Sequence, residues 1–323
     1  MGSAAYQVHM RSIPLPSLLD TALDRTLIGY SNLGYRARRS SRPADAPPGV
    51  REGKVALGTG AKAGLGRATA AGLAQLGATV RMAVRGREDG ERVAAEITAE
   101  VPGAELVVDE LDVSSLADVR AYAAAFEGPL HALIHNAGVM PPQREVTGEG
   151  HERMLATHVL GPHLLTSLLR GRLEPGARVI WVSSGGMYGQ RLHADDLEYE
   201  HGEYKPTTGY ARTKRAQVVL SELWADELRE DAVVVHAMHP GWADTPGVAT
   251  SLPGFRRLTR PILRSNEQGA DTIVWLAAAD APLRSTGRFW HDRRERPTHY
   301  TGRTKEGEAD RRALWEACER LTA

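Results

Sequence analysis

Lys54-Val-Ala-Leu-Gly-Thr-Gly-Ala-Lys-Ala-Gly-Leu-Gly66 predicts a β-strand, a glycine-rich turn and the start of an α-helix at Leu65. Gly60 permits a sharp turn, Gly64 lets the backbone approach a pyrophosphate, and Gly66 lets the helix pack close to the strand. The N-terminus of a helix attracts negative charge. The segment therefore predicts a dinucleotide-binding turn.

The rest of the chain repeats a strand followed by a helix. Apolar runs that are typical of buried strands begin near Val55, Thr79, Leu106, Ala132, Val179 and Val233. Helical periodicity follows over residues 68–76, 116–126 and 154–169. This alternation predicts right-handed crossovers and a parallel sheet with helices on both faces. We expect an α/β fold: a single Rossmann-like, doubly wound domain over residues 51–323, preceded by an N-terminal helical extension.

Charge and cysteine content narrow the class of protein. Lys plus Arg and Asp plus Glu both number 40, so no net charge favours nucleic acid, and we expect no nucleic-acid partner. The single cysteine, Cys318, excludes an internal disulfide and favours a reducing compartment; we expect it to pack in a helix. No apolar run approaches the about 18 residues of a membrane span, which favours a cytoplasmic protein. No metal site is expected, because compact ligand spacing is missing around His131, His135, His158 and His163.

Residues 1–50 differ in pattern from the rest and form the predicted extension. An amphipathic helix is indicated by apolar residues at helical spacing, namely Leu15, Leu18, Leu19, Ala22, Leu23, Leu27 and Ile28. Residues 36–48 are basic and proline-rich, which predicts a linker. The helix either packs on the protein's own surface, which is the plainer interpretation, or contacts a membrane surface or a partner.

The end of the second predicted strand indicates which dinucleotide is preferred. An acidic residue there would bind the adenosine ribose hydroxyls and repel a 2′-phosphate. An arginine there would pair with the 2′-phosphate. The strand ends in Arg85, and no carboxylate occurs before Glu88. Lys62 in the glycine turn adds positive charge. We therefore expect NADP to be favoured over NAD.

Two further segments follow strands on the same side of the predicted sheet. Asp112 and Val113 suit an adenine ring, through a carboxylate and an apolar wall, although Asp112 could instead cap the next helix. Asn136-Ala137-Gly138 ends the fourth strand, where small residues let the backbone run beside the cofactor. Both segments are predicted to bind the dinucleotide.

Tyr210 and Lys214 lie four positions apart on a predicted helix, so their side chains share one face. An ammonium there would stabilise phenolate and lower the pKa of the tyrosine, which is about 10 when unperturbed. Such a tyrosine can act as an acid and a base. Ser184, after the apolar run 177–182, can donate to a substrate oxygen, and we prefer it over Ser183.

Together these motifs resemble the short-chain dehydrogenase/reductase family over about residues 54–280. The resemblance implies one Rossmann-like domain, NAD(P), and reversible hydride transfer between the cofactor and an alcohol or carbonyl carbon. It implies that Ser184 orients the substrate, that Tyr210 is the general acid and base, and that Lys214 also binds the nicotinamide ribose. It also implies contacts with the nicotinamide end by Pro240, Gly241, Trp242 and Thr245, and a homo-oligomer.

A closer likeness to one subgroup of that family lies in four stretches: Val182-Ser-Ser-Gly-Gly-Met187, Met238-His-Pro-Gly-Trp-Ala-Asp-Thr-Pro-Gly-Val248, Gln268-Gly-Ala-Asp-Thr272 and Gly287-Arg-Phe289. One position departs from the family pattern. His158 stands where the family usually has an asparagine that holds a helix kink and a relay water. A histidine could preserve that water or lower the activity.

The motifs predict an NADP-dependent oxidoreductase that acts on a carbonyl or alcohol carbon of a small, lipophilic substrate. The pocket is predicted to be lined by Met140, Pro141, Met187, Tyr188 and Trp242. Residues 247–263 are expected to form a flap over it, residues 284–305 a surface loop, and residues 308–321 a closing helix. The alternatives are a dinucleotide-binding sensor or scaffold without turnover, and, more remotely, a sugar-nucleotide epimerase.

Overall fold

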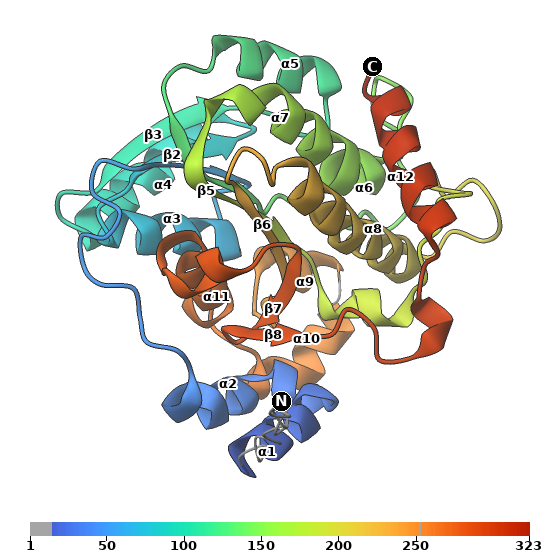
Figure 1. Cartoon of the computed structure of the whole chain (residues 1–323), viewed down its shortest axis with the longest axis horizontal. Coiled ribbons are helices and arrows are strands. Elements are labelled where there is room, and N and C mark those ends of the chain that lie inside the picture. The colour runs from blue at the N-terminus through green and yellow to red at the C-terminus, as the bar shows by residue number, and fades with distance from the viewer. Residues whose placement is uncertain (1–14, 252) are drawn as a thin grey trace, which may run out of the picture.

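A computed structural model describes residues 15–251 and 253–323, and within them the chain forms one mostly parallel sheet between layers of helices (Figure 1). The strand order is β3-β2-β1-β4-β5-β6-β7-β8, with β8 antiparallel to β7 and the other neighbouring pairs parallel. The strands are β1 (Val55–Thr59), β2 (Thr79–Val84), β3 (Glu105–Glu110), β4 (Leu130–His135), β5 (Leu173–Val182), β6 (Val234–Met238), β7 (Arg288–His291) and β8 (Arg294–Arg296). This arrangement confirms the predicted α/β fold.

Helices cover both faces of the sheet (Figure 1). They are α1 (Leu15–Asp24), α2 (Asn32–Arg38), α3 (Gly64–Gln75), α4 (Arg87–Glu100), α5 (Leu116–Ala125), α6 (Arg153–Leu155), α7 (Gly161–Leu169), α8 (Pro206–Glu227), α9 (Pro246–Ser251), α10 (Pro253–Thr259), α11 (Asn266–Ala278) and α12 (Glu308–Leu321). One apolar core lies between the sheet and α3, α4 and α11. A second core lies between the sheet and α5, α7 and α8.

The chain changes direction across the sheet at β1, which pairs with β2 on one side and with β4 on the other. Parallel pairing brings the carboxyl ends of these strands to one edge, where open α/β sheets bind ligands. The glycine turn, residues 136–138, Ser184 and residues 239–241 all follow strands at this edge. Tertiary structure therefore brings the predicted motifs together.

Residues 288–296 form a hairpin, so the prediction of a surface loop over residues 284–305 is wrong for that part. Strands β7 and β8 are joined by Asp292 and Arg293, whose φ values of 51° and 58° match a tight two-residue turn. Phe289 and Trp290 are buried in the two cores. The closing helix α12 is confirmed, and Cys318 is buried within it.

The extension packs against the β7–β8 hairpin. Packing on the protein's own surface is the plainer of the two interpretations that the sequence allows. Asp20 of α1 forms ion pairs with Arg38 and Arg296 (2.6 and 2.7 Å between N and O). Arg38 ends helix α2 and is only 1% exposed, so the prediction of a linker that begins at residue 36 is wrong there. Residues 1–14 of the predicted extension lie outside the described residues. In the described part of the chain, no helix combines the length and apolar character that crossing a bilayer requires.

Candidate active site

The glycine turn between β1 and α3 has the geometry that the sequence predicts. Gly60 and Gly64 have φ values of 66° and 55°, which favour glycine. A Cβ on Gly66 would lie 2.2 Å from the carbonyl oxygen of Gly60, so only glycine lets α3 begin so close to the turn. The N-cap residue Ala63 offers no side-chain hydrogen bond to the first N–H groups of α3. These groups fit an anionic phosphate, as a dinucleotide requires.

The segment Asn136-Ala137-Gly138 is bound to this turn. Thr59 accepts hydrogen bonds at its Oγ1 from the backbone N–H groups of Asn136 and Ala137, both at 3.1 Å. The Asn136 side chain donates to the carbonyl oxygen of Thr59 at 2.9 Å. A Cβ on Gly60 would lie 2.9 Å from the Cα of Ala137, so the two loops touch through their backbones. Gly138 remains exposed beside them.

Two cations lie near the end of β2. Arg85 is exposed at the end of the strand and, among the described residues, forms no ion pair or hydrogen bond. Lys62 Nζ lies 2.8 Å from the carboxylate of Asp89, an exposed pair that solvent screens. Arg85 is therefore the group that is free to meet an added phosphate.

Asp112 and Val113 follow β3, near the same edge. The Asp112 carboxylate accepts hydrogen bonds from the Ser114 backbone N–H (2.9 Å) and hydroxyl (2.7 Å). The N-cap of α5 is Ser115, so the alternative in which Asp112 caps that helix is wrong. Val113 is buried, and a Cβ on Gly161 would lie 1.8 Å from its carbonyl oxygen. This loop therefore contacts the helices behind the site.

The loop after β6 reaches back to the glycine turn. A Cβ on Gly64 would lie 3.4 Å from the side chains of Thr245 and Pro246. Gly241 has a φ of 75°, and a Cβ there would lie 2.5 Å from Nε of Arg264. Residues 240–245 therefore face the predicted phosphate site from the opposite side, with Pro240, Trp242 and Thr245 partly exposed.

The two serines after β5 have different environments. Ser183 is buried, and its hydroxyl donates to the carbonyl oxygen of Lys214 at 2.8 Å. Ser184 is partly exposed, and its side chain lies close enough to Tyr210 to lower the pKa of that phenol. Its Oγ also accepts the backbone N–H of Gly186 at 3.2 Å. Ser184 is therefore the serine that can reach a substrate together with Tyr210.

Lys214 lies one turn beyond Tyr210 on α8 and is 2% exposed. Its Nζ donates to the carbonyl oxygen of Val182 at 2.9 Å and to the side-chain oxygen of Gln217 at 3.0 Å. The same Nζ is 5.3 Å from the centroid of the Tyr210 ring. Burial lowers the pKa of Lys214 to about 7, because an ammonium is costly away from water.

Burial also raises the pKa of Tyr210 to about 12, although the nearby Ser184 side chain opposes this shift. The prediction that the neighbouring ammonium lowers this pKa is wrong for this structure. Removal of the phenol from water is the largest cause of the shift, and Nζ of Lys214 is directed to Val182 and Gln217. The pair is nevertheless close enough for a protonated Lys214 to stabilise a phenolate.

His158 lies in a π-helical turn (Ala156–Leu160) and connects three parts of the site. Its Nε2 accepts the backbone N–H of Val139 at 3.0 Å, so its Nδ1 carries the proton and donates to Thr213 at 2.8 Å. Its carbonyl oxygen accepts a hydrogen bond from Gln217 at 2.9 Å. Burial, followed by the charge of Lys214, lowers its pKa well below the usual range, which keeps the imidazole neutral.

Gln217 is a site residue that the motifs do not include. Its side chain bridges Lys214 Nζ and the His158 carbonyl, and it is fully buried. It lies three positions after Lys214 on α8, so helical spacing alone places it on the same face. A polar residue there is the signal that could have identified it.

The predicted substrate-pocket residues differ in their burial. Met187 is 0% exposed and packs in the core, so the prediction that it lines the pocket is wrong. Met140, Tyr188 and Trp242 are partly exposed. Residues 247–263, the predicted flap, contain most of α9 and all of α10, and Ser251 donates to the carbonyl oxygen of Met140 at 3.0 Å.

Comparison with known proteins identifies the family of this chain. A family model described as short chain dehydrogenase matches residues 54–253. A Bos taurus protein, dehydrogenase/reductase SDR family member 12, is 40% identical over 299 residues, covering 90% of this chain and 93% of its own. The polyprenol dehydrogenase of Mus musculus is 35% identical over 311 residues, covering 91% of each chain. The first relative represents the subgroup that the four stretches indicate.

Solved structures with a similar fold support the same family. An uncharacterised protein from Mycobacterium paratuberculosis superposes with a TM-score of 0.70 at 29% identity, covering 86% of this chain and 96% of its own. A 3-ketoacyl-(acyl-carrier-protein) reductase from Brucella melitensis, complexed with NADH, superposes with a TM-score of 0.58 at 28% identity, covering 74% and 96%. This chain belongs to the short-chain dehydrogenase/reductase family of NAD(P)-dependent oxidoreductases that act on CH–OH or C=O groups.

Proposed function

We propose that this protein is an NADP-dependent oxidoreductase that interconverts a carbonyl and an alcohol on a small, lipophilic substrate. The observation that carries the proposal is the placement of Tyr210 beside Ser184, close enough for the serine to lower the pKa of the phenol, with Lys214 one helical turn away. These groups stand at the edge of the sheet where the glycine turn offers free N–H groups to a phosphate.

The bound dinucleotide supplies or accepts the hydride. Ser184 donates a hydrogen bond to the substrate oxygen and fixes its position next to Tyr210. The Tyr210 hydroxyl transfers its proton to that oxygen during reduction and recovers it during oxidation. Lys214, when protonated, stabilises the phenolate that this transfer leaves. Gln217 and the Val182 carbonyl hold Nζ of Lys214 in place for this role.

The preference for NADP rests on Arg85. Its guanidinium is exposed at the end of β2, where the adenosine ribose is bound in Rossmann-like folds. Arginine pairs with phosphate through two parallel hydrogen bonds, which a bare ribose does not offer. Lys62 adds a second positive charge, although Asp89 neutralises part of it.

The preference for a lipophilic substrate rests on the side chains beside Ser184. Met140, Tyr188 and Trp242 are partly exposed and mostly apolar, which suits a hydrocarbon or aromatic group. The mouse relative is named for its action on polyprenol, a lipophilic alcohol, which supports the same class of substrate.

The direct test follows oxidation of NADPH in the presence of a panel of aldehydes and ketones. Tyr210→Phe is expected to bind NADPH as the wild type does and to lose turnover by about 10²- to 10⁴-fold. Tyr204→Phe, a change at a half-buried loop tyrosine that packs against Tyr199, serves as the matched control. Retention of turnover by Tyr210→Phe would refute the assigned role of Tyr210.

A second candidate is a dinucleotide-binding sensor or scaffold without turnover. It is favoured by one observation: burial raises the pKa of Tyr210 to about 12, which opposes formation of a phenolate. Wild-type protein that binds NADPH but turns over none of the carbonyl or alcohol panel would favour the sensor.

A further inference from the structure

We propose that Tyr30, from the N-terminal extension, forms a wall of the substrate site beside Ser184 and helps to select the substrate. The inference rests on the proposed oxidoreductase function and deepens it. It assigns to the extension a part of the binding site that the family motifs, which begin at residue 54, do not contain.

The backbone around Tyr30 is fixed to the loop that follows β6. The backbone N–H of Trp242 donates to the carbonyl oxygen of Tyr30 at 2.8 Å. Arg264 donates from Nη2 to the carbonyl oxygen of Gly29 at 3.0 Å and from Nε to that of Ser31 at 3.2 Å. A Cβ on Gly241 would lie 2.7 Å from the carbonyl oxygen of Tyr30, so this close approach requires glycine. Three consecutive carbonyls of the extension are thus bound by the catalytic domain.

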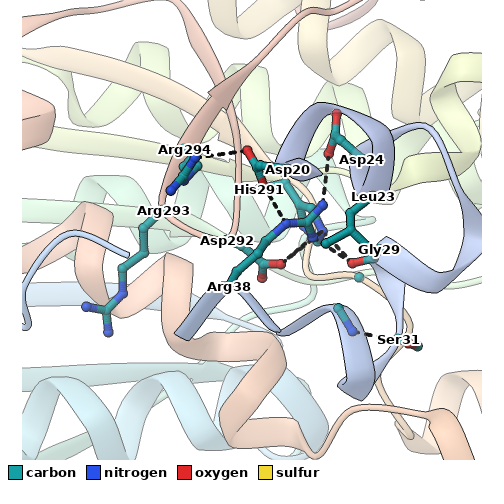
Figure 2. Close-up of polar contacts among 12 residues, drawn as sticks. Asp20, Leu23, Asp24, Gly29, Ser31, Arg38, His291, Asp292, Arg293 and Arg294 are labelled. Carbon is teal, nitrogen blue, oxygen red and sulfur yellow. Dashed lines mark hydrogen bonds and ion pairs between the residues drawn. The ribbon is translucent and has the colours of Figure 1, made fainter. Parts of the chain in front are cut away.

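Buried charges hold this segment in place (Figure 2). Asp292, in the turn between β7 and β8, pairs with Arg38 of the extension at 2.7 Å and with Arg264 at 2.6 Å. The side chains of all three residues are 1% exposed. Arg38 also donates to the carbonyl oxygen of Gly29 at 2.8 Å. Displacing the segment would leave Arg38 and Asp292 buried with fewer charged partners, so these contacts fix the backbone at Tyr30.

The ring of Tyr30 lies next to the residue that follows Ser184. A Cβ placed on Gly185 would be 3.6 Å from Cε2 of Tyr30, which is ordinary van der Waals contact. The ring meets His239 edge-on, with 4.9 Å between centroids, and lies 6.1 Å from the nearer ring of Trp242. Tyr30 therefore stands between the serine loop and the loop predicted to hold the nicotinamide end.

The hydroxyl of Tyr30 joins a second pair of aromatic residues. Tyr300 lies close enough to Tyr30 to lower the pKa of that phenol, and the ring of Tyr300 stacks on that of Tyr188 with 4.1 Å between centroids. Tyr188 is one of the predicted pocket residues, and its hydroxyl donates to the carbonyl oxygen of Pro297 at 2.8 Å. The wall is thus a continuous aromatic surface built from the extension, the serine loop and the tail of the chain.

A ligand can reach this wall. Tyr30, Ser184, Gly185, Tyr188 and Trp242 all keep partial exposure to solvent. Burial, followed by the charges of His291 and Arg264, lowers the pKa of the adjacent His239 well below its usual range, so the wall carries no imidazolium charge. An aromatic or long-chain group attached to the carbonyl carbon fits such a surface, because it gains apolar and ring contacts there.

The test compares Tyr30→Ala and Tyr30→Leu with the wild type, using benzaldehyde, decanal and propanal as substrates with NADPH. Both variants are expected to lower kcat/KM for benzaldehyde and decanal about tenfold relative to propanal. Tyr30→Phe keeps the ring and is expected to retain the wild-type selectivity. Tyr35→Ala removes a tyrosine of the same extension that stacks on Arg42, and it serves as the matched control.

A binding measurement that needs no turnover accompanies the kinetics. Calorimetric titration of benzyl alcohol and decan-1-ol into the NADPH-loaded protein is expected to show about tenfold weaker binding in Tyr30→Ala and Tyr30→Leu, with Tyr35→Ala unchanged. Folded variants with wild-type selectivity and wild-type alcohol binding would overturn the role of Tyr30 and leave the oxidoreductase intact. Alcohol binding that depends on Tyr30 without any turnover would support the wall and overturn the oxidoreductase. Absence of both turnover and binding in the wild type would overturn both.

Discussion

Arg38 and Asp292, 254 positions apart in the sequence, form an ion pair of 2.7 Å with both side chains 1% exposed. Burial opposes ionisation of Asp292, but the charges of His291, Arg264 and Arg38, together with a hydrogen bond from Arg264, hold its pKa far below the usual range. The pair joins the extension to the β7–β8 turn. The extension therefore supplies a charge that pairs with a buried charge of the folded domain.

Removal of Arg38 is expected to destabilise the whole domain. Arg38→Met leaves Asp20 and Asp292 buried with fewer cationic partners, and the free energy of unfolding should fall by about 3–5 kcal/mol. Urea unfolding followed by circular dichroism measures this change. Arg39→Met, at the exposed neighbouring position, should change it by less than about 0.5 kcal/mol. Equal stability of the two variants would contradict the ion-pair account.

His158 is expected to tolerate asparagine better than leucine. His158→Leu leaves the Val139 N–H without its acceptor and Oγ1 of Thr213 without its donor, so the free energy of unfolding should fall by about 1–3 kcal/mol and turnover should fall with it. His158→Asn can still hydrogen-bond and is expected to keep turnover within about tenfold of wild type. Thermal unfolding and kcat/KM of both variants test this prediction. A leucine variant with the stability and turnover of the wild type would show that the imidazole contacts are dispensable.

The lowered pKa of Lys214 predicts that the free energy of unfolding depends on pH. The folded protein releases the Lys214 proton near pH 7, whereas the unfolded chain keeps it up to the ordinary pKa of 10.5. Between these values the unfolded chain binds more protons, so Lys214 makes the free energy of unfolding rise with pH. Lys214→Met should remove this rise, which amounts to a few kcal/mol in order of magnitude.

Urea unfolding at pH 7, 8 and 9 tests the Lys214 prediction. Lys205→Met, a change at an exposed lysine before α8, should keep the wild-type slope of stability against pH. If the two methionine variants have the same slope, Lys214 does not titrate in this range.

Arg85 is expected to determine the preference for NADP. Arg85→Ala removes the guanidinium and should raise the KM for NADPH about tenfold or more, because hydrogen bonds to charged groups contribute about 1.5–3 kcal/mol. The KM for NADH should stay unchanged. Arg92→Ala, on the exposed face of α4, is the matched control. A wild-type enzyme that uses NADH more efficiently than NADPH would refute the preference.

Local pattern was enough to predict the central domain. The alternation of apolar strands and amphipathic helices fixes the parallel sheet, because each element must bury one face. The strand starts near Val55 and Thr79 and the closing helix Glu308–Leu321 agree with the structure. The glycine turn was predictable for the same reason: its constraint lies within a few consecutive residues.

The extension and the β7–β8 hairpin could not be predicted in this way. Residues 284–305 and 36–48 are rich in arginine, which normally faces water, so they indicate a loop and a linker. Arg38 is nevertheless buried, because Asp292, 254 positions further along the chain, neutralises its charge. The hairpin turn also lacks glycine, the usual signal for positive φ.

The sequence by itself determined the α/β sheet, the dinucleotide turn and the serine, tyrosine and lysine of the site, because these follow from periodicity and short spacing. Only the tertiary structure decided that Gln217 bridges Lys214 to the His158 carbonyl, that Met187 belongs to the core, and that the extension lies against the serine loop. The physical reason is that burial and charge pairing depend on residues far apart in the chain, which no local pattern contains.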